Sequence, residues 1–364
     1  MATAADAVPV MGTARLKNLV GLSIEPGLIA AAQVSVNGSI RIEDGGRAAL
    51  EPGVVRDGDV ADSAALADAL RALWAEHKQL DKRVRIGVAN ARIVVRTLYL
   101  PPITDPKQLA SAVSFQAAEA IPMPLKDAVL DFHAVGITDG PDGPRQRIVL
   151  VAARRDMITG MLTAARAAGL KPMGIDLSAF GMVRALQRQR RESDGPELFV
   201  AVGGLSNLAI SDRGICAFTR VAGGGIEALA GELAERRELT ADQARAWLYS
   251  VGLQTPMGDV VGDPSIAADA RTVLTGGVRR IATEIRASLD FHAGQPEGGR
   301  EVDRVVLTGP AMAIPGFGAA LAAELDLEVD ERAVGSSKDM NLSELDAASL
   351  SVAAGLALEN GLMP

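Results

Sequence analysis

Two segments of this chain share one pattern, and they begin about 180 residues apart. Each has two apolar runs separated by a short turn, and a second, glycine-containing turn follows. The first spans residues 18–40 and turns at Glu25-Pro26-Gly27, whereas the second spans 198–218 and turns at Gly203-Gly204. Glycine-containing turns between apolar runs are typical of β-hairpins. A hairpin that opens each half of the chain predicts two related lobes facing one another across a cleft.

Strands alternate with helices along the chain, which indicates an α/β protein. Because each half opens with a hairpin and then passes to a helix, the pattern favours a two-lobed actin-like (ribonuclease-H-like) fold over a single doubly wound sheet. Between the lobes, a helix, two strands and a helix predict an inserted α/β subdomain. We expect a flexible N-terminal tail at 1–17, a first lobe at 18–103 and 173–196, the insertion at 104–172, a second lobe at 197–345, and a C-terminal helix at 346–360 that packs back on the first lobe.

Composition excludes some classes of partner. The formal net charge is −8 and aromatic residues make up only 3% of the chain. The charge disfavours nucleic acid, and so few rings argue against a base-stacking surface. The arginines at 188, 190 and 191 cluster, which we interpret as a solvated helix end before a loop. The single cysteine, Cys216, fits a reducing compartment and a small buried side chain.

The sequence predicts a cytoplasmic protein that does not insert into a membrane. No apolar run reaches the length of about 18 residues that a transmembrane helix needs. Residues 1–14 contain no lysine or arginine, so they do not resemble a signal peptide. The histidines at 77, 133 and 292 are isolated and lack the spacing of metal ligands.

Several segments resemble the type IV pilus assembly protein PilM family. The most specific are Glu-Ala-Ile-Pro-Met-Pro at 119–124 and Ala-Gly-Leu-Lys-Pro at 168–172. The resemblance covers residues 18–360, and this family is similar to the actin-like division protein FtsA, which also has an inserted subdomain. Further matching segments are 88–100, 129–132, 150–154, 179–180 and 286–291.

The resemblance implies a location, partners and a cofactor. Members of the family are cytoplasmic and lie at the inner face of the plasma membrane through their partners. They bind the short N-terminal cytoplasmic tail of the membrane protein PilN, and so anchor the other proteins of the pilus platform. We expect that tail to bind at a groove between the first lobe and the insertion. The family also binds ATP in the cleft, so ATP with Mg²⁺ is the implied cofactor.

The two hairpin turns lack the acids that such a cleft uses. In actin-like proteins each turn carries Asp-x-Gly, in which glycine lets backbone N–H groups approach a phosphate and aspartate orients Mg²⁺. Here Ser23 and Glu25 stand at the Asp and Gly positions of the first turn. In the second turn Ala201 replaces the aspartate and Gly203 is kept. A carboxylate about 4 Å from a phosphate would repel it by up to about 4 kcal/mol per unit charge at an effective dielectric near 20, unless Glu25 itself helps to hold Mg²⁺.

The residues that could still hold a nucleotide are mostly glycines. The run at 223–225 precedes a helix and could bind an anion at its N-terminus, or could only make a tight turn. Gly309 stands at the adenosine side, but Pro310 and Ala311 follow it where the family has further glycines. Ser206 and Asn207 could also donate to a phosphate, but polar residues in a hairpin turn need no ligand. The candidate remnant site comprises Gly203, Gly204, Ser206, Asn207, Gly223, Gly224, Gly225 and Gly309.

Two functions remain open. The first is a non-enzymatic scaffold of a type IV pilus or related secretion platform, with a degenerate nucleotide site and no catalytic residue. The alternative is a nucleotide-dependent switch or slow ATPase that binds Mg-ATP between the lobes. A sugar or acetate kinase of the same superfamily is disfavoured, because neither turn supplies a catalytic acid or a Mg²⁺-binding aspartate.

Overall fold

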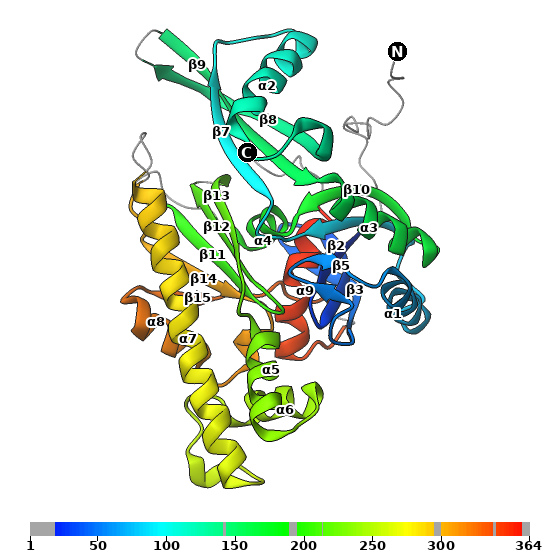
Figure 1. The fold of residues 1–364 in the computed structure, drawn as a ribbon, viewed down its shortest axis with the longest axis vertical. Helices are drawn as coiled ribbons and strands as arrows, with labels where there is room; N and C mark the ends of the chain where they lie inside the picture. Colours follow the sequence, from blue (N-terminus) through cyan, green and yellow to red (C-terminus); the bar gives the residue numbers. More distant parts are fainter. Residues whose placement is uncertain are drawn as a thin grey trace.

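The computed structural model describes residues 19–140, 143–188, 195–212, 214–294, 300–337 and 340–358. The expected tail at 1–17 and the clustered Arg190 and Arg191 lie outside these residues. Figure 1 shows two lobes and a smaller α/β unit that projects from them. Among the described helices, none combines the length and the hydropathy needed to cross a membrane.

The first lobe is built on a five-stranded sheet in the order β10-β6-β1-β2-β3. The antiparallel pairs β1–β2 and β2–β3 come from the first predicted hairpin, and β1, β6 and β10 run parallel. The strands are β1 (Val20–Glu25), β2 (Leu28–Val36), β3 (Ile40–Ala49), β6 (Arg83–Val88) and β10 (Lys171–Leu177). A short ribbon, β4 (Val55–Arg56) and β5 (Asp59–Val60), precedes helix α1 (Ser63–Glu76), which the Asp62 side chain caps.

The second lobe repeats this connectivity. Its sheet has the order β13-β12-β11-β14-β15, with an antiparallel hairpin followed by parallel strands. The strands are β11 (Glu197–Val202), β12 (Ser206–Asp212), β13 (Ile215–Ala222), β14 (Arg304–Thr308) and β15 (Val329–Glu331). Each lobe therefore opens with a hairpin whose first strand lies at the centre of its sheet. The predicted α/β fold with two related lobes is confirmed.

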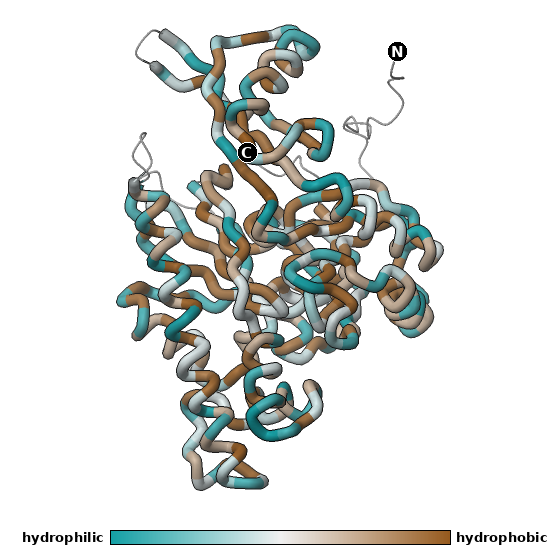
Figure 2. Tube along the Cα trace, viewed as in Figure 1, coloured by the Kyte–Doolittle hydropathy of each residue, from teal (hydrophilic) through white to brown (hydrophobic). Residues whose placement is uncertain are grey.

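The outer helices of the second lobe pack on the far face of its sheet. They bury a separate apolar core, in which Leu198, Val200 and Val202 of β11 meet α5 and α7. Figure 2 shows hydrophobic segments gathered where the sheets and α9 lie. The helices are α5 (Ile226–Arg237), α6 (Ala241–Val251), α7 (Pro264–Ala293) and α8 (Phe317–Leu325). Single helical turns lie at Met257–Asp259 and Pro310–Ala313 in this lobe and at Leu125–Asp127 in the insertion.

The insertion is a three-stranded antiparallel sheet covered on one face by a helix. Strands β7 (Val94–Leu100), β9 (Gly143–Arg154) and β8 (Ala128–Gly140) pair in that order. Helix α2 (Pro106–Ala120) begins at the predicted cap, since Asp105 accepts a hydrogen bond from the Gln108 N–H at 2.8 Å. Val113 and Ala117 of α2 pack on Leu98, Ile148 and Leu150 of the sheet, giving the insertion its own core.

Two elements belong to other units than the expected bounds of the insertion, 104–172, assign them to. Strand β7 was expected to belong to the first lobe, but it pairs with β9 in the sheet of the insertion. Helix α3 (Arg155–Ala167) was expected to close the insertion, but its Met157, Met161 and Ala164 pack in the core of the first lobe. An amphipathic pattern shows which face of a helix is buried and does not show which core receives it.

Two helices lie between the two sheets. These are α4 (Ser178–Leu186) and α9 (Glu344–Leu356), and their buried side chains share one core with Phe199 and Val306 of the second lobe. The helices touch through glycine, because a Cβ on Gly355 would lie only 1.7 Å from the carbonyl oxygen of Gly181. Helix α9 also lies directly on β1, where a Cβ on Gly21 would be 1.9 Å from the carbonyl oxygen of Ala353.

The contact between α4 and α9 can be tested with two matched substitutions. Gly355→Ala is expected to lower the free energy of unfolding by about 1–3 kcal/mol, because overpacking forces the backbones apart. Gly231 lies inside α5, where an added Cβ meets no atom within 4 Å. Gly231→Ala should therefore raise the free energy of unfolding by about 0.5–1 kcal/mol. Urea denaturation of both variants measures the difference. A stabilised Gly355→Ala protein would contradict the close packing.

Candidate functional site

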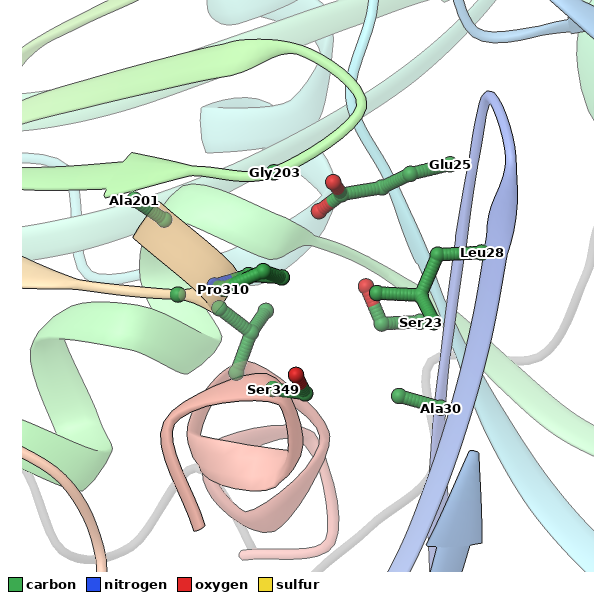
Figure 3. Close-up of a pocket in the computed structure, with 10 residues that line it drawn as sticks. Ser23, Glu25, Leu28, Ala30, Ala201, Gly203, Pro310 and Ser349 are labelled. Atoms are coloured by element: carbon green, nitrogen blue, oxygen red, sulfur yellow. The ribbon is translucent and has the colours of Figure 1, made fainter. Parts of the chain in front are cut away.

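The turns of the two hairpins meet in the cleft between the lobes. The Glu25 carboxylate at the end of β1 accepts a hydrogen bond from the Gly204 N–H, with 3.0 Å between Oε2 and N. The backbones also touch, since a Cβ on Gly204 would lie 2.0 Å from the carbonyl oxygen of Pro26. Figure 3 shows the Glu25 side chain directed at the turn that holds Gly203. A carboxylate from the first lobe therefore occupies a backbone donor of the second.

A small cavity lies beside this contact. Ser23 and Ala201 both line it, so the two positions where an actin-like cleft carries aspartate do face the same space. The volume open to the centre of a water molecule is about 10 Å³, roughly the minimum for one water, so the cavity is far too small for a nucleotide as it stands. Its lining residues are Ser23, Glu25, Leu28, Ala30, Ala201, Gly203, Gly309, Pro310, Ser349 and Val352.

Burial controls the charge of Glu25. It raises the pKa of this carboxyl group from 4.5 to about 7, although hydrogen bonds from the Gly204 and Leu205 backbone oppose the shift. Near neutral pH the group therefore carries a fractional negative charge. In the part of the chain that the structure describes, no cluster of three or more histidine, cysteine, aspartate or glutamate side chains could hold a metal ion.

The glycine run before α5 is only partly available to an anion. The Ile226 N–H, the first of the helix, donates to the Gly203 carbonyl at 2.7 Å. A Cβ on Gly225 would lie 2.2 Å from that same oxygen. This contact supports the tight-turn interpretation of Gly225, whereas Gly223 and Gly224 have open space beside them.

Gly309 lies at the mouth of the same cavity. It follows β14 with φ of 87°, a conformation that favours glycine, and the Pro310 ring lines the cavity directly after it. Figure 3 shows Pro310 between Ala201 and Ser349. The ring thus fills space that bare backbone would leave open.

Ser206 and Asn207 do not line the cavity beside Glu25. Both are buried, and neither the Ser206 hydroxyl nor the Asn207 amide has a hydrogen-bond partner among the described residues. Asn207 lines a different cavity, between β12–β13 and residues 88–93. The structure therefore gathers Gly203, Gly204, Gly225 and Gly309 but separates Asn207 from them.

Sequence reasoning missed the contribution of α9 to the site. Ser349 and Val352 come from this helix, about 150 residues beyond the second turn, and line the cavity. Figure 3 shows Ser349 facing Ser23. Residues 348–356 are all buried. A helix without a polar face is surrounded on all sides, and this pattern could have signalled a central position.

Comparisons with known proteins agree with the two-lobed fold described above. The model of the family described as type IV pilus assembly protein PilM matches residues 21–361. A solved structure described as a PilM-PilN type IV pilus biogenesis complex is 23% identical, with 95% of this chain and 99% of that chain covered and a TM-score of 0.76. The ethanolamine utilization protein EutJ from Carboxydothermus hydrogenoformans is 14% identical, with 93% and 88% covered and a TM-score of 0.52. MreB5 of Spiroplasma citri bound to ADP is 12% identical, with 93% and 94% covered and a TM-score of 0.51. These similarities show the actin-like fold.

The buried Glu25 predicts a pH dependence of stability. Its pKa is higher in the folded protein, so between pH 4.5 and about 7 the folded state keeps a proton that the unfolded chain has lost. The free energy of unfolding should fall through this group as pH rises, by up to about 1.4 kcal/mol per pH unit. Glu25→Gln cannot ionise and should lack this slope. Urea denaturation of both proteins measures their difference, which should level off above about pH 7. A difference independent of pH would contradict the burial.

Proposed function

Because the chain belongs to the type IV pilus assembly protein PilM family, we propose that it is an actin-like scaffold of a pilus or related secretion platform. It would bind the short N-terminal cytoplasmic tail of a PilN-like membrane protein. The similar solved structure described as a PilM-PilN complex supports a partner of this kind. Through that tail the protein would be held at the cytoplasmic face of the plasma membrane, next to the other platform proteins.

The proposed scaffold has a degenerate nucleotide site. The observation that carries this is the hydrogen bond from the Gly204 N–H to the Glu25 carboxylate. A phosphate would have to displace this carboxylate or bind beside it, against a repulsion of up to about 4 kcal/mol per unit charge. Micromolar affinity amounts to only about 8 kcal/mol. The loss of both aspartates, at Ser23 and Ala201, also removes the groups that would orient Mg²⁺.

A nucleotide-dependent switch is the second candidate. Gly203 and Gly309 line the same cavity, as the phosphate and adenosine sides of an actin-like cleft would. The raised pKa of Glu25 also means that part of the population has a neutral side chain near pH 7, which weakens the repulsion. This candidate requires the lobes to separate, because the turns touch at Gly204 and Pro26.

We place the tail on the face of the insertion sheet that α2 leaves uncovered. Thr97, Asp131 and His133 are exposed there, and Val151 packs partly against the core of the first lobe. Although Asp131 is exposed overall, partial desolvation of its carboxyl group raises its pKa, and the charge of Asp176 on β10 adds to the shift. Asp176 is already ion-paired with Arg184, so Asp131 is the carboxyl group at the junction of the insertion and the first lobe that favours a positively charged segment.

Titration with Mg-ATP separates the two candidates. A micromolar site weakened by about 4 kcal/mol has a dissociation constant near 1 mM, so calorimetry at micromolar protein should detect no saturation. Glu25→Gly removes the competing carboxylate and should tighten binding about tenfold or more, whereas Glu25→Gln keeps the side-chain volume and should gain less. A micromolar constant for the wild-type protein would overturn the degenerate site and favour the switch.

Titration with the partner's tail tests the scaffold. We expect a synthetic peptide of the tail to bind with an affinity that Mg-ATP does not change. Thr97→Trp should weaken binding about tenfold or more by blocking the uncovered face. Arg96→Trp is the matched control, since adjacent residues of β7 point to opposite faces of the sheet. Absence of binding by the wild-type protein, with or without ATP, would contradict the proposed function.

A further inference from the structure

A second cavity lies where both lobes meet the root of the insertion. The volume open to the centre of a water molecule is about 80 Å³, and the cavity shares no lining residue with the one beside Glu25. Residues 88–93, which connect β6 to β7, form one wall. The start of α4 forms another, with Leu177 and Ala179, and strands β12 and β13 form the third, with Asn207 and Val221. The open volume is room for several water-sized groups.

Asn207 is the unexplained group in this cavity. Its side chain is 3% exposed, and neither Oδ1 nor Nδ2 has a partner among the residues that the structure describes. An unpaired buried polar group costs about 1–3 kcal/mol, so native proteins seldom leave one without a partner or a purpose. Asn90 lines the same cavity and differs, because its Nδ2 donates to the Asp57 carbonyl at 2.8 Å and its Oδ1 accepts from the Arg92 N–H at 2.8 Å.

The rest of the lining restricts the chemistry of an occupant. Most of it is aliphatic, and no acidic side chain lines the cavity. The one charged lining residue is Arg220, whose guanidinium already donates to Glu284 at 2.6 Å. A complementary ligand is therefore neutral at the contact with Asn207, offers an adjacent donor and acceptor, and has apolar flanks. The peptide group of an extended apolar chain has this pattern.

We propose that this cavity receives the end of the partner's cytoplasmic tail, with Asn207 pairing to a peptide group of that tail. The cavity lies next to the start of β7, because Ala91 and Ile93 line it and β7 begins at the next residue. Strand β7 also contacts β13. At about 3.3 Å per residue, a segment of roughly seven to ten residues lying along β7 reaches the cavity. The second lobe thereby contributes to the peptide site.

This inference rests on the proposed function, and binding measurements with three variants test it. A fluorescently labelled synthetic tail is titrated into the full chain by anisotropy. Asn207→Ala removes the amide, and Ala91→Trp fills the mouth of the cavity from an exposed position. Each should weaken binding about tenfold or more, which corresponds to about 1.4 kcal/mol. Asn37→Ala, in an exposed turn, is the control and should bind like the wild-type protein.

The outcomes are distinguishable. Thermal unfolding of Asn207→Ala should occur at the wild-type temperature or above, because the variant removes an unpaired buried amide. Weaker binding by this stable variant and by Ala91→Trp supports the inference. Wild-type affinity in both would mean that the cavity holds water only, and would overturn the inference while leaving the scaffold intact. Absence of binding by the wild-type protein would overturn the scaffold and the inference together.

Discussion

The contact between α4 and α9 is the constraint on which the rest of the molecule depends. The helices lie between two sheets and approach so closely that Gly181 and Gly355 leave no space for a side chain. Side chains from both lobes therefore share one core, which includes Phe199 of β11. A buried ion pair strengthens the junction, since Arg332 donates to Glu197 at 2.9 Å and to the Leu186 carbonyl at 3.1 Å. Such a core sets the positions of both hairpin turns.

With the lobes fixed in this way, the turns lie within hydrogen-bonding distance. In a nucleotide-binding cleft the donors of the second turn face a phosphate, but here the Gly204 N–H meets Glu25. A carboxylate of the protein itself thus occupies a backbone donor of this turn. Ser23 and Ala201, which carry no charge, line the cavity beside it. The two-lobed architecture is held by the packing of α4 and α9 in the core that the lobes share.

The sequence predicted the features that local pattern controls. Paired hairpins, the cap at Asp105 and the position of Glu25 at the cleft follow from turn chemistry and spacing. It did not predict that α3 packs on the first lobe or that β7 belongs to the insertion, because the choice of core depends on tertiary contacts. The separation of Asn207 from Gly203 was also missed. These residues are four positions apart, but β12 carries the Asn207 side chain to a wall that only the folded lobes create.

The way in which the insertion is attached has a consequence for its evolution. The chain enters through β7 and leaves through β9, and these strands are paired from Val94 and Ala152 onward. Entry and exit thus lie side by side, and the insertion encloses its own core. A unit attached at one point of the scaffold can be lengthened, shortened or exchanged between lineages without disturbing the central helices.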